Sequence, residues 1–122
     1  MLDLSSPHNN VDHLSINELI DNYLCSLSYI KLDDAIRIIH EFGPNSMCCK
    51  LDISEELKHL PISSKQWHRF CFKWDNLYYN FGRLPFGCRS SPRLFDMLSR
   101  SICWIVKSDY NISVILHLLG DF

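Results

Sequence analysis

The sequence predicts an α+β fold in which an antiparallel sheet packs on helices. Three observations support this prediction: a strand-like alternation of apolar and polar residues, two aromatic-rich runs joined by a turn signal, and a long stretch of apolar residues at helical spacing. The predicted order is helix, strand, hairpin, long helix and strand, at residues 33–42, 46–53, 68–81, 91–105 and 112–119.

The first helical segments are indicated by their start and stop signals. Residues 1–10 carry serine, proline and asparagine, which is loop chemistry. Ser15 and Glu18 have the spacing of a capping box and predict a short helix. Asp33 or Asp34 is expected to cap the second helix, and Gly43-Pro44 to end it. The apolar residues of this helix share one face, at Ile36, Ile39 and Phe42.

Residues 46–53 read as a strand, because apolar and polar residues alternate along them. Lys50 and Asp52 lie on the polar face of this strand. Residues 54–57 then suggest a helical turn up to Pro61. The runs 68–74 and 77–81, joined by Asp75-Asn76, predict a hairpin.

A long helix is expected to open with Ser91 as N-cap and Pro92 at its first position. Its apolar residues follow helical spacing, at Leu94, Phe95, Leu98, Ile102 and Ile105. Residues 112–119 form a final apolar strand that ends at the turn signal Gly120-Asp121.

Length and composition are those of one globular domain. The chain has 122 residues, enough for a single core that buries roughly two thirds of the unfolded surface. Hydrophobic residues make up 47% and charged residues 21%, which argues against disorder. Because the formal net charge is −2, any nucleic-acid binding needs a local basic patch.

The six cysteines and six histidines show no zinc-ligand spacing, since the sequence has neither a C-x-x-C nor an H-x-x-x-H pair. We therefore expect no zinc site, and small buried thiols in a reducing compartment. The longest apolar run falls far short of the roughly 18 residues of a membrane span, and no leader opens the chain. We expect an intracellular protein, cytoplasmic or nuclear, with no membrane partner.

Taken singly, the polar and aromatic features have ordinary structural readings. Asp52 at a strand end is typical of a turn or cap residue, and Gly120-Asp121 of a turn. Residues 84–87 fit a plain loop. The three tryptophans fit core or rim positions better than base-stacking platforms, at Trp67, Trp74 and Trp104.

Six motifs nevertheless occur in one order along the chain. They are Lys50-Leu51-Asp52-Ile53, Leu60-Pro61-Ile62, Trp67, Tyr78-Tyr79, Leu84-Pro85-Phe86-Gly87-Cys88-Arg89-Ser90-Ser91-Pro92 with Phe95, and His117-Leu118-Leu119-Gly120-Asp121-Phe122. Together they resemble the reverse transcriptases of retroelements, most closely those of tyrosine-recombinase (DIRS-type) retrotransposons. That family's pattern reads roughly K-x-D-I, L-P-I, W, Y-Y, L-P-F-G-L-R-S-A-P, F and H-Y-L-D-D-F. Residues 2–7 and 23–34 are similar too, so the resemblance runs from end to end.

The resemblance implies RNA-directed DNA polymerase chemistry with two Mg²⁺ ions, one activating the primer hydroxyl and one neutralising the triphosphate. It assigns catalytic and metal-binding roles to Asp52 and Asp121, and a further metal contact to the carbonyl of Ile53. The nucleotide-binding residues would be Leu57, Leu84, Pro85, Phe86 and Gly87. The implied partners are an RNA or DNA template-primer and a deoxynucleoside triphosphate.

The implied architecture is a fragment of a polymerase right hand, a single partial reverse transcriptase domain over residues 1–122. Residues 1–45 would be fingers-like, and residues 46–122 palm, with a fingers hairpin inserted at about 66–83. The catalytic hairpin would be incomplete, because its returning strand and the thumb would lie beyond Phe122. An unpaired strand of this kind favours self-association.

The chain departs from the family pattern at the turn. Gly120 stands where the family has the first aspartate of its pair, so an anionic ligand is lost. Glu56 and Leu57 replace an alanine-aromatic pair whose ring screens the 2′ position of the sugar. The basic residue that the family has before residues 2–4 would fall upstream of Met1. We therefore predict that this copy is catalytically inactive.

Two other classes of function stay open. The first is a non-catalytic nucleic-acid-binding module, for which the basic residues are Lys50, Lys58, Lys65, Arg69, Lys73, Arg83, Arg89 and Arg93. The second is a small interaction protein, or a remnant with no selected role.

Overall fold

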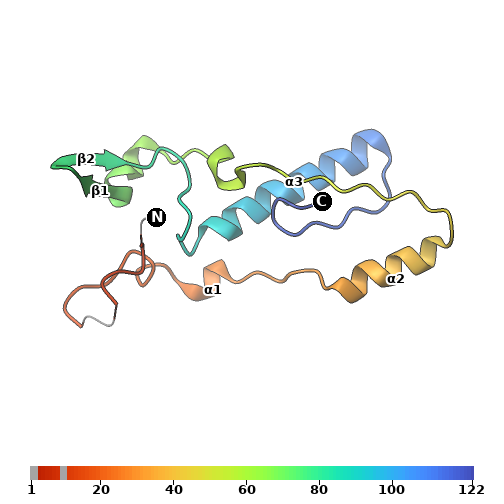
Figure 1. The fold of residues 1–122 in the computed structure, drawn as a ribbon, viewed down its shortest axis with the longest axis horizontal. Helices are drawn as coiled ribbons and strands as arrows, with labels where there is room; N and C mark the ends of the chain where they lie inside the picture. The colour runs from red at the N-terminus through yellow and green to blue at the C-terminus, as the bar shows by residue number, and fades with distance from the viewer. Residues whose placement is uncertain (1–2, 9–10) are drawn as a thin grey trace.

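Helix α3, Ser91–Tyr110, runs along a small α+β domain whose single sheet has two antiparallel strands. The computed structural model describes residues 3–8 and 11–122. In Figure 1 the hairpin lies at one end of an elongated molecule and helix α2 at the other. The other elements in chain order are α1 (Asn22–Cys25), α2 (Leu32–Phe42), the 3-10 helices η1 (Glu56–His59) and η2 (Ser64–Phe70), β1 (Cys71–Trp74) and β2 (Leu77–Asn80).

The predicted hairpin is confirmed at its turn. Strands β1 and β2 pair with Phe72 opposite Tyr79. Asp75 and Asn76 have φ values of 46° and 57°, the left-handed conformation that a two-residue hairpin turn of type I′ requires. The prediction that the first strand begins at His68 was wrong, because the 3-10 helix η2 occupies the chain up to Phe70.

Helix α3 begins one residue earlier than predicted. Ser90 is the N-cap and Ser91 the first helical residue, whose hydroxyl donates to the Pro85 carbonyl at 3.0 Å. The buried stripe of the helix consists of small residues as well as one ring, at Phe95, Ser99 and Cys103. Of the predicted apolar face, Phe95 is buried, whereas Leu94 and Ile105 are about half exposed.

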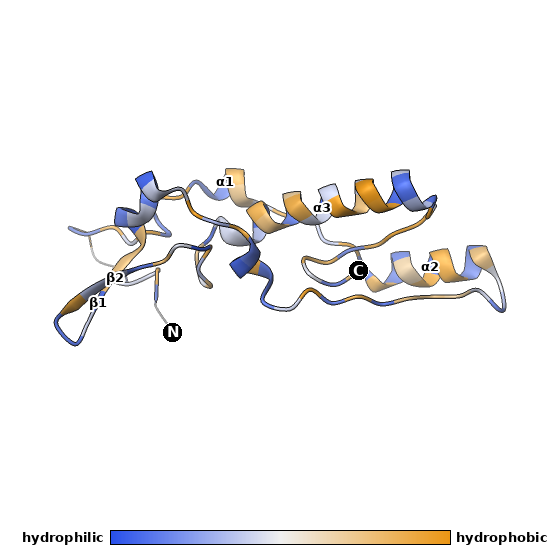
Figure 2. Ribbon diagram, turned by 90° about the horizontal axis from the view of Figure 1, so that it is seen from above, coloured by the Kyte–Doolittle hydropathy of each residue, from blue (hydrophilic) through white to orange (hydrophobic). Residues whose placement is uncertain are grey.

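Helix α2 has the predicted end but not the predicted cap. It begins at Leu32, and the carboxylate of Asp34 accepts a hydrogen bond from the Lys31 N–H at 3.0 Å from within the first turn. Gly43 ends the helix with φ of 80°, and its N–H donates to the Ile39 carbonyl. The apolar face is exposed, at Ile36, Ile39 and Phe42. Figure 2 shows α2 lying apart from α3, which leaves this face without a helical neighbour.

The capping box forms without the helix that it predicted. Glu18 accepts from the Ser15 N–H at 2.7 Å, and the Ser15 hydroxyl accepts from the Glu18 N–H at 3.3 Å. These bonds close only a turn over residues 16–19, because nucleating a helix is costly and the apolar side chains here, Leu14 and Leu19, are largely exposed. The four-residue helix α1 follows at Asn22. The loop predicted over 1–10 lies partly outside the described residues.

The two predicted outer strands, residues 46–53 and 112–119, were wrong as regular strands. Both segments are largely extended, but only isolated pairings form, at Asp52 with Asp121 and at Leu118 with Asp121. Within the described part of the chain, residues 112–117 make no backbone hydrogen bond to another segment's backbone. Without a neighbouring strand, alternation alone does not make a sheet.

The core lies where η1, residues 60–62, residues 81–85 and α3 meet. Its buried side chains are Leu57, Ile62, Leu84 and Phe95, with Ile53, Leu60, Phe70, Phe81, Leu98 and Leu119 packed around them. The tryptophans do not belong to it, since Trp74 and Trp104 are largely exposed. Cys88 and Cys103 are buried as expected, but the expectation was wrong for three exposed thiols, Cys48, Cys49 and Cys71.

Candidate functional site

Residues 51–53 and 120–122 run antiparallel and bring two aspartates face to face. Leu51 and Phe122 exchange both backbone hydrogen bonds, at 2.9 and 2.8 Å, and the Ile53 N–H donates to the Gly120 carbonyl at 2.9 Å. In this register Asp52 lies directly opposite Asp121 in a non-hydrogen-bonded pair. Side chains of such pairs share one face of the ribbon, with Cβ atoms about 4.5–5.5 Å apart.

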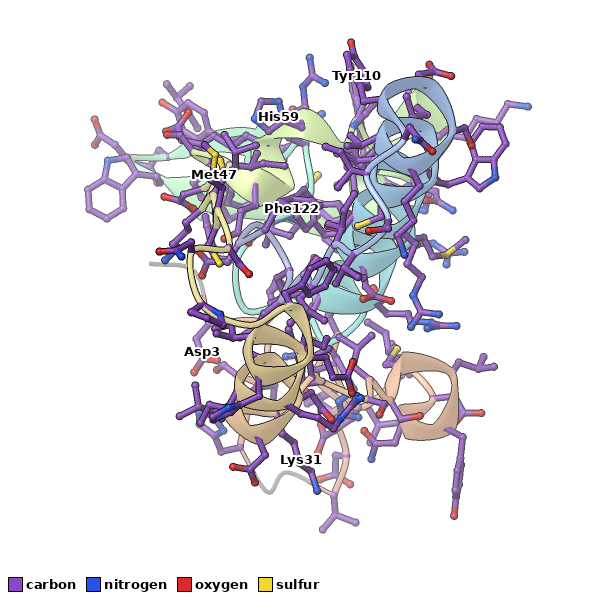
Figure 3. All side chains as sticks on the ribbon, turned by 90° about the vertical axis from the view of Figure 1, so that its right-hand side faces the viewer. Asp3, Lys31, Met47, His59, Tyr110 and Phe122 are labelled. Atoms are coloured by element: carbon purple, nitrogen blue, oxygen red, sulfur yellow. The ribbon has the colours of Figure 1, made fainter. Side chains whose placement is uncertain are left out.

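The turn that carries Asp121 is anchored to α3. Leu118 and Asp121 exchange backbone hydrogen bonds at 2.8 and 3.1 Å, and Leu119 has a φ of 54°. The hydroxyl of the fully buried Ser99 donates to the Leu119 carbonyl at 2.7 Å. Figure 3 shows Phe122 between α3 and the extended chain near Met47. The turn is therefore held from the helix as well as through its own bonds.

One cation lies on the same face as the two carboxylates. The Lys50 Nζ is 3.0 Å from Asp121 Oδ1. Lys50 and Asp52 are two residues apart in an extended segment, so they point to the same side. Like charges directly opposite each other in a strand pair are destabilising, and the ammonium group offsets part of that repulsion.

The side chains present do not fit a two-magnesium centre. Magnesium takes hard oxygen ligands in near-octahedral geometry, usually with carboxylates among them. Gly120 supplies no side chain, and Lys50 is paired with Asp121. Across residues 3–8 and 11–122, no three His, Cys, Asp or Glu side chains are grouped so that they could hold a metal ion. Ile53 is half-buried and packs against the core.

The predicted nucleotide-binding residues are divided between a cleft and the core. Leu84, Pro85 and Phe86 line a cleft of about 270 Å³, together with two cations and a ring, Lys58, Arg83 and Phe81. Gly87 follows with a φ of 84°, a conformation that favours glycine. Leu57 is part of the buried core and does not line this cleft. Neither Asp52 nor Asp121 lines it.

Asn17 binds the segment that follows this cleft, a role that no sequence pattern indicated. Its side-chain amide donates to the Gly87 carbonyl at 2.8 Å and to the Ser5 hydroxyl at 2.9 Å. Its oxygen accepts from the Arg89 N–H at 2.8 Å. Asn17 is buried, so it joins two segments 70 residues apart. Its place inside a capping-box sequence suggested only a local role.

A second polar group joins α3 to the C-terminal segment. The buried carboxylate of Asp96 accepts from Arg100 Nε at 2.8 Å and lies 3.3 Å from His117 Nε2. His117 Nδ1 is 3.6 Å from the Cys103 sulfur. Cys103, His117 and Asp96 follow one another in the way that a nucleophile, a base and an orienting acid do in some active sites. However, burial raises the pKa of the Cys103 thiol, which opposes formation of the thiolate. The contacts of these side chains link α3 to the C-terminal segment.

Comparisons with protein-family models, curated proteins and solved structures found no match to this chain. Among the helices that the structure describes, none is long and apolar enough to cross a membrane.

Proposed function

We propose that this chain is a fingers-and-palm fragment of a retroelement reverse transcriptase, with RNA-directed DNA polymerase chemistry as its ancestral function. The proposal is supported by the order of the six motifs and by one geometric observation. Asp52 and Asp121, 69 positions apart, lie opposite each other across a strand pair. A polymerase palm needs carboxylates from two strand ends at one place, so that divalent ions can bridge primer and triphosphate.

The chain by itself does not carry out this reaction. Gly120 provides no carboxylate, and the ammonium of Lys50 competes with a divalent ion for Asp121. Losing a partner even outside the first ligand shell typically costs about 10–100-fold in metal affinity or activity. The cleft beside Leu84 to Phe86 keeps two cations, Lys58 and Arg83, that suit a triphosphate.

A primer-extension assay tests this proposal. Purified chain with a primer-template, Mg²⁺ and deoxynucleoside triphosphates is expected to incorporate nothing above background. Incorporation that the variant Asp52→Ala abolishes would show that the present side chains suffice. The coding sequence on either side tests the ancestry: a second palm strand and a thumb in the same frame would support it.

The second candidate function is non-catalytic nucleic-acid binding, and the distribution of charge favours it. Residues 57–95 contain seven lysines and arginines against a single acidic residue, Asp75, a net charge of +6. The rest of the chain is therefore strongly acidic, which the overall charge of −2 conceals. A basic stretch of this size is the electrostatic signature of backbone binding.

The hairpin adds exposed aromatic rings to this basic stretch. Trp74 and Tyr78 are 71% and 78% exposed. The Lys73 ammonium lies 5.7 Å from the centre of the Tyr78 ring. Rings of this kind stack on unpaired bases at about 1–3 kcal/mol per base, while nearby cations follow the phosphates.

Fluorescence anisotropy with labelled single-stranded RNA distinguishes the two candidates. Binding through three or four phosphates predicts a fall in affinity with salt, at a logarithmic slope of about −2 to −3. Trp74→Ala and Arg83→Ala should each weaken binding, and Lys107→Ala, an exposed cation outside residues 57–95, should not. A flat salt response would eliminate this function.

Self-association through the unpaired segment 112–117 stays a prediction. The segment is extended, and apolar side chains along and beside it are partly exposed, at Ile112, Val114 and Leu118. Unpaired extended backbone is a template for pairing with another chain. Sedimentation velocity over a range of concentrations should show dimers, and Val114→Lys should abolish them. A monomer at every concentration would contradict the prediction.

A further inference from the structure

The glycine at the turn is covered by a glutamate side chain. A β-carbon built on Gly120 would lie 2.6 Å from Cγ, 2.8 Å from Cδ and 2.9 Å from Oε1 of Glu56. Real β-carbons essentially never approach other heavy atoms this closely. The backbone of Gly120 does not have the left-handed conformation that disfavours side chains, and the three nearest heavy atoms all belong to the Glu56 side chain.

This crowding is specific to position 120. A β-carbon at Gly82, the glycine of the cleft, would meet nothing within 4 Å. Gly82 is exposed, whereas Gly120 is buried beneath the Glu56 side chain. The two glycines therefore form a natural pair for comparison, since an added β-carbon meets open space at Gly82 and the end of the Glu56 side chain at Gly120.

The backbone of Glu56 cannot easily move away. Glu56 opens the 3-10 helix η1, and the next residue, Leu57, is buried in the core. Glu55 before it has a left-handed conformation with φ of 55°. Ile53, three residues earlier, is bonded to the Gly120 carbonyl. Only the Glu56 side chain is free to leave, by turning out toward solvent.

We propose that Glu56 determines what position 120 can hold. A side chain at position 120 would occupy the space that the Glu56 side chain fills in this protein. A carboxyl group is thus supplied by η1 at this turn, in addition to that of Asp121. The link to palm chemistry rests on the function proposed above, whereas the mutual exclusion of the two side chains does not.

The consequence is that Gly120→Asp places an aspartate at this position only if the Glu56 side chain turns away. The new side chain would enter the volume of Glu56 and add a carboxylate next to that of Glu56. Both effects oppose it, one by overlap and one by like charge. Removal of the Glu56 side chain relieves both.

A double-mutant cycle on the full chain tests the proposal, with thermal unfolding followed by circular dichroism. Gly120→Ala should lower Tm by about 2–4 °C, because the flexible end of the Glu56 side chain has to turn away. In the Glu56→Ala background the same change should cost nothing or raise Tm slightly, because alanine restricts the unfolded chain more than glycine does. Gly82→Ala is the matched control and should leave Tm nearly unchanged.

Glu56→Gln separates volume from charge. Glutamine keeps the length of glutamate, so Gly120→Ala should stay costly beside it, whereas Gly120→Asp should be better tolerated than beside Glu56. The proposal is overturned if Gly120→Ala is as harmless as Gly82→Ala in the unaltered chain. It is also overturned if the cost of Gly120→Ala is the same with and without the Glu56 side chain.

A metal titration keeps the two proposals apart. Broadening of NMR signals near residues 52 and 121 by Mn²⁺ should be stronger in Glu56→Ala/Gly120→Asp than in Gly120→Asp alone. Coupling in the unfolding cycle without any Mn²⁺ effect would refute the palm function and leave the role of Glu56 intact. Absence of coupling would refute that role whatever the metal does.

Discussion

Replacing Asp52 by asparagine removes one of two carboxylates that face each other across the pairing of residues 51–53 with 120–122. Two unit charges about 5 Å apart repel by about 0.8 kcal/mol in bulk water, and by more where the protein displaces water. The contact of Lys50 with Asp121 at 3.0 Å offsets part of this. We therefore expect Asp52→Asn to raise the free energy of unfolding by about 0.5 kcal/mol.

Urea unfolding measures this change. With a urea m-value of roughly 1–3 kcal/mol/M, the midpoint should rise by about 0.2–0.5 M with no change in m. Asp121→Asn also removes the partner of Lys50, so the cycle with Asp52→Asn/Asp121→Asn isolates the repulsion between the carboxylates. The coupling should fall sharply at about 1 M salt, where the screening length is roughly 3 Å.

Either of two results would refute the facing arrangement. One is a zero coupling between positions 52 and 121 at low salt. The other is a loss of more than about 1 kcal/mol on Asp52→Asn, because a destabilisation of that size indicates a buried or bonded carboxylate rather than an exposed, repelled one. In both cases the two aspartates would not share a face in solution.

Three further changes test the contacts that hold the site. Ser99→Ala should lower the free energy of unfolding by about 1–3 kcal/mol, because the Leu119 carbonyl loses a buried donor at 2.7 Å; an unchanged urea midpoint would show that the turn does not need it. Asn17→Ala should lower the free energy of unfolding by a similar amount and speed amide exchange at residues 87–89. Unchanged protection there would show that the hydrogen bonds of Asn17 do not hold this segment. The hydrogen bond from the Ser15 N–H lowers the pKa of Glu18, so Glu18 stabilises the fold above pH 4.5 and loses this effect as pH falls through its folded pKa. Glu18→Gln should therefore be less stable than the parent near pH 6, and the difference should vanish below the folded pKa of Glu18; a constant difference would refute this.

The residues that begin or end helices and form turns were the most predictable part of the fold. Gly43 ends its helix and Asp75-Asn76 turn the hairpin as predicted, because each acts through its own backbone conformation. Pro92 lies in the first turn of α3, although the cap is Ser90. Such local effects need no distant partner, which is why the printed sequence suffices for them.

Features that depend on a partner were not predictable in this way. Residues 46–53 alternate as a strand should, but only 51–53 have a neighbour to pair with. The capping box at Ser15 forms its bonds, yet no apolar surface packs there to extend the helix. Ile36 and Phe42 share a face as predicted, but both side chains are about half exposed.

The candidate site also combines features that the sequence shows with features that depend on how the chain packs. The order of motifs along the chain, and the absence of a carboxyl group at Gly120, follow from the sequence alone. Only the tertiary structure decided that Asp52 lies opposite Asp121, that Lys50 is paired there, and that Glu56 fills the space over Gly120. The physical reason is that residue types and local spacing set backbone conformation. Which side chains meet across 69 positions depends on how the segments pack.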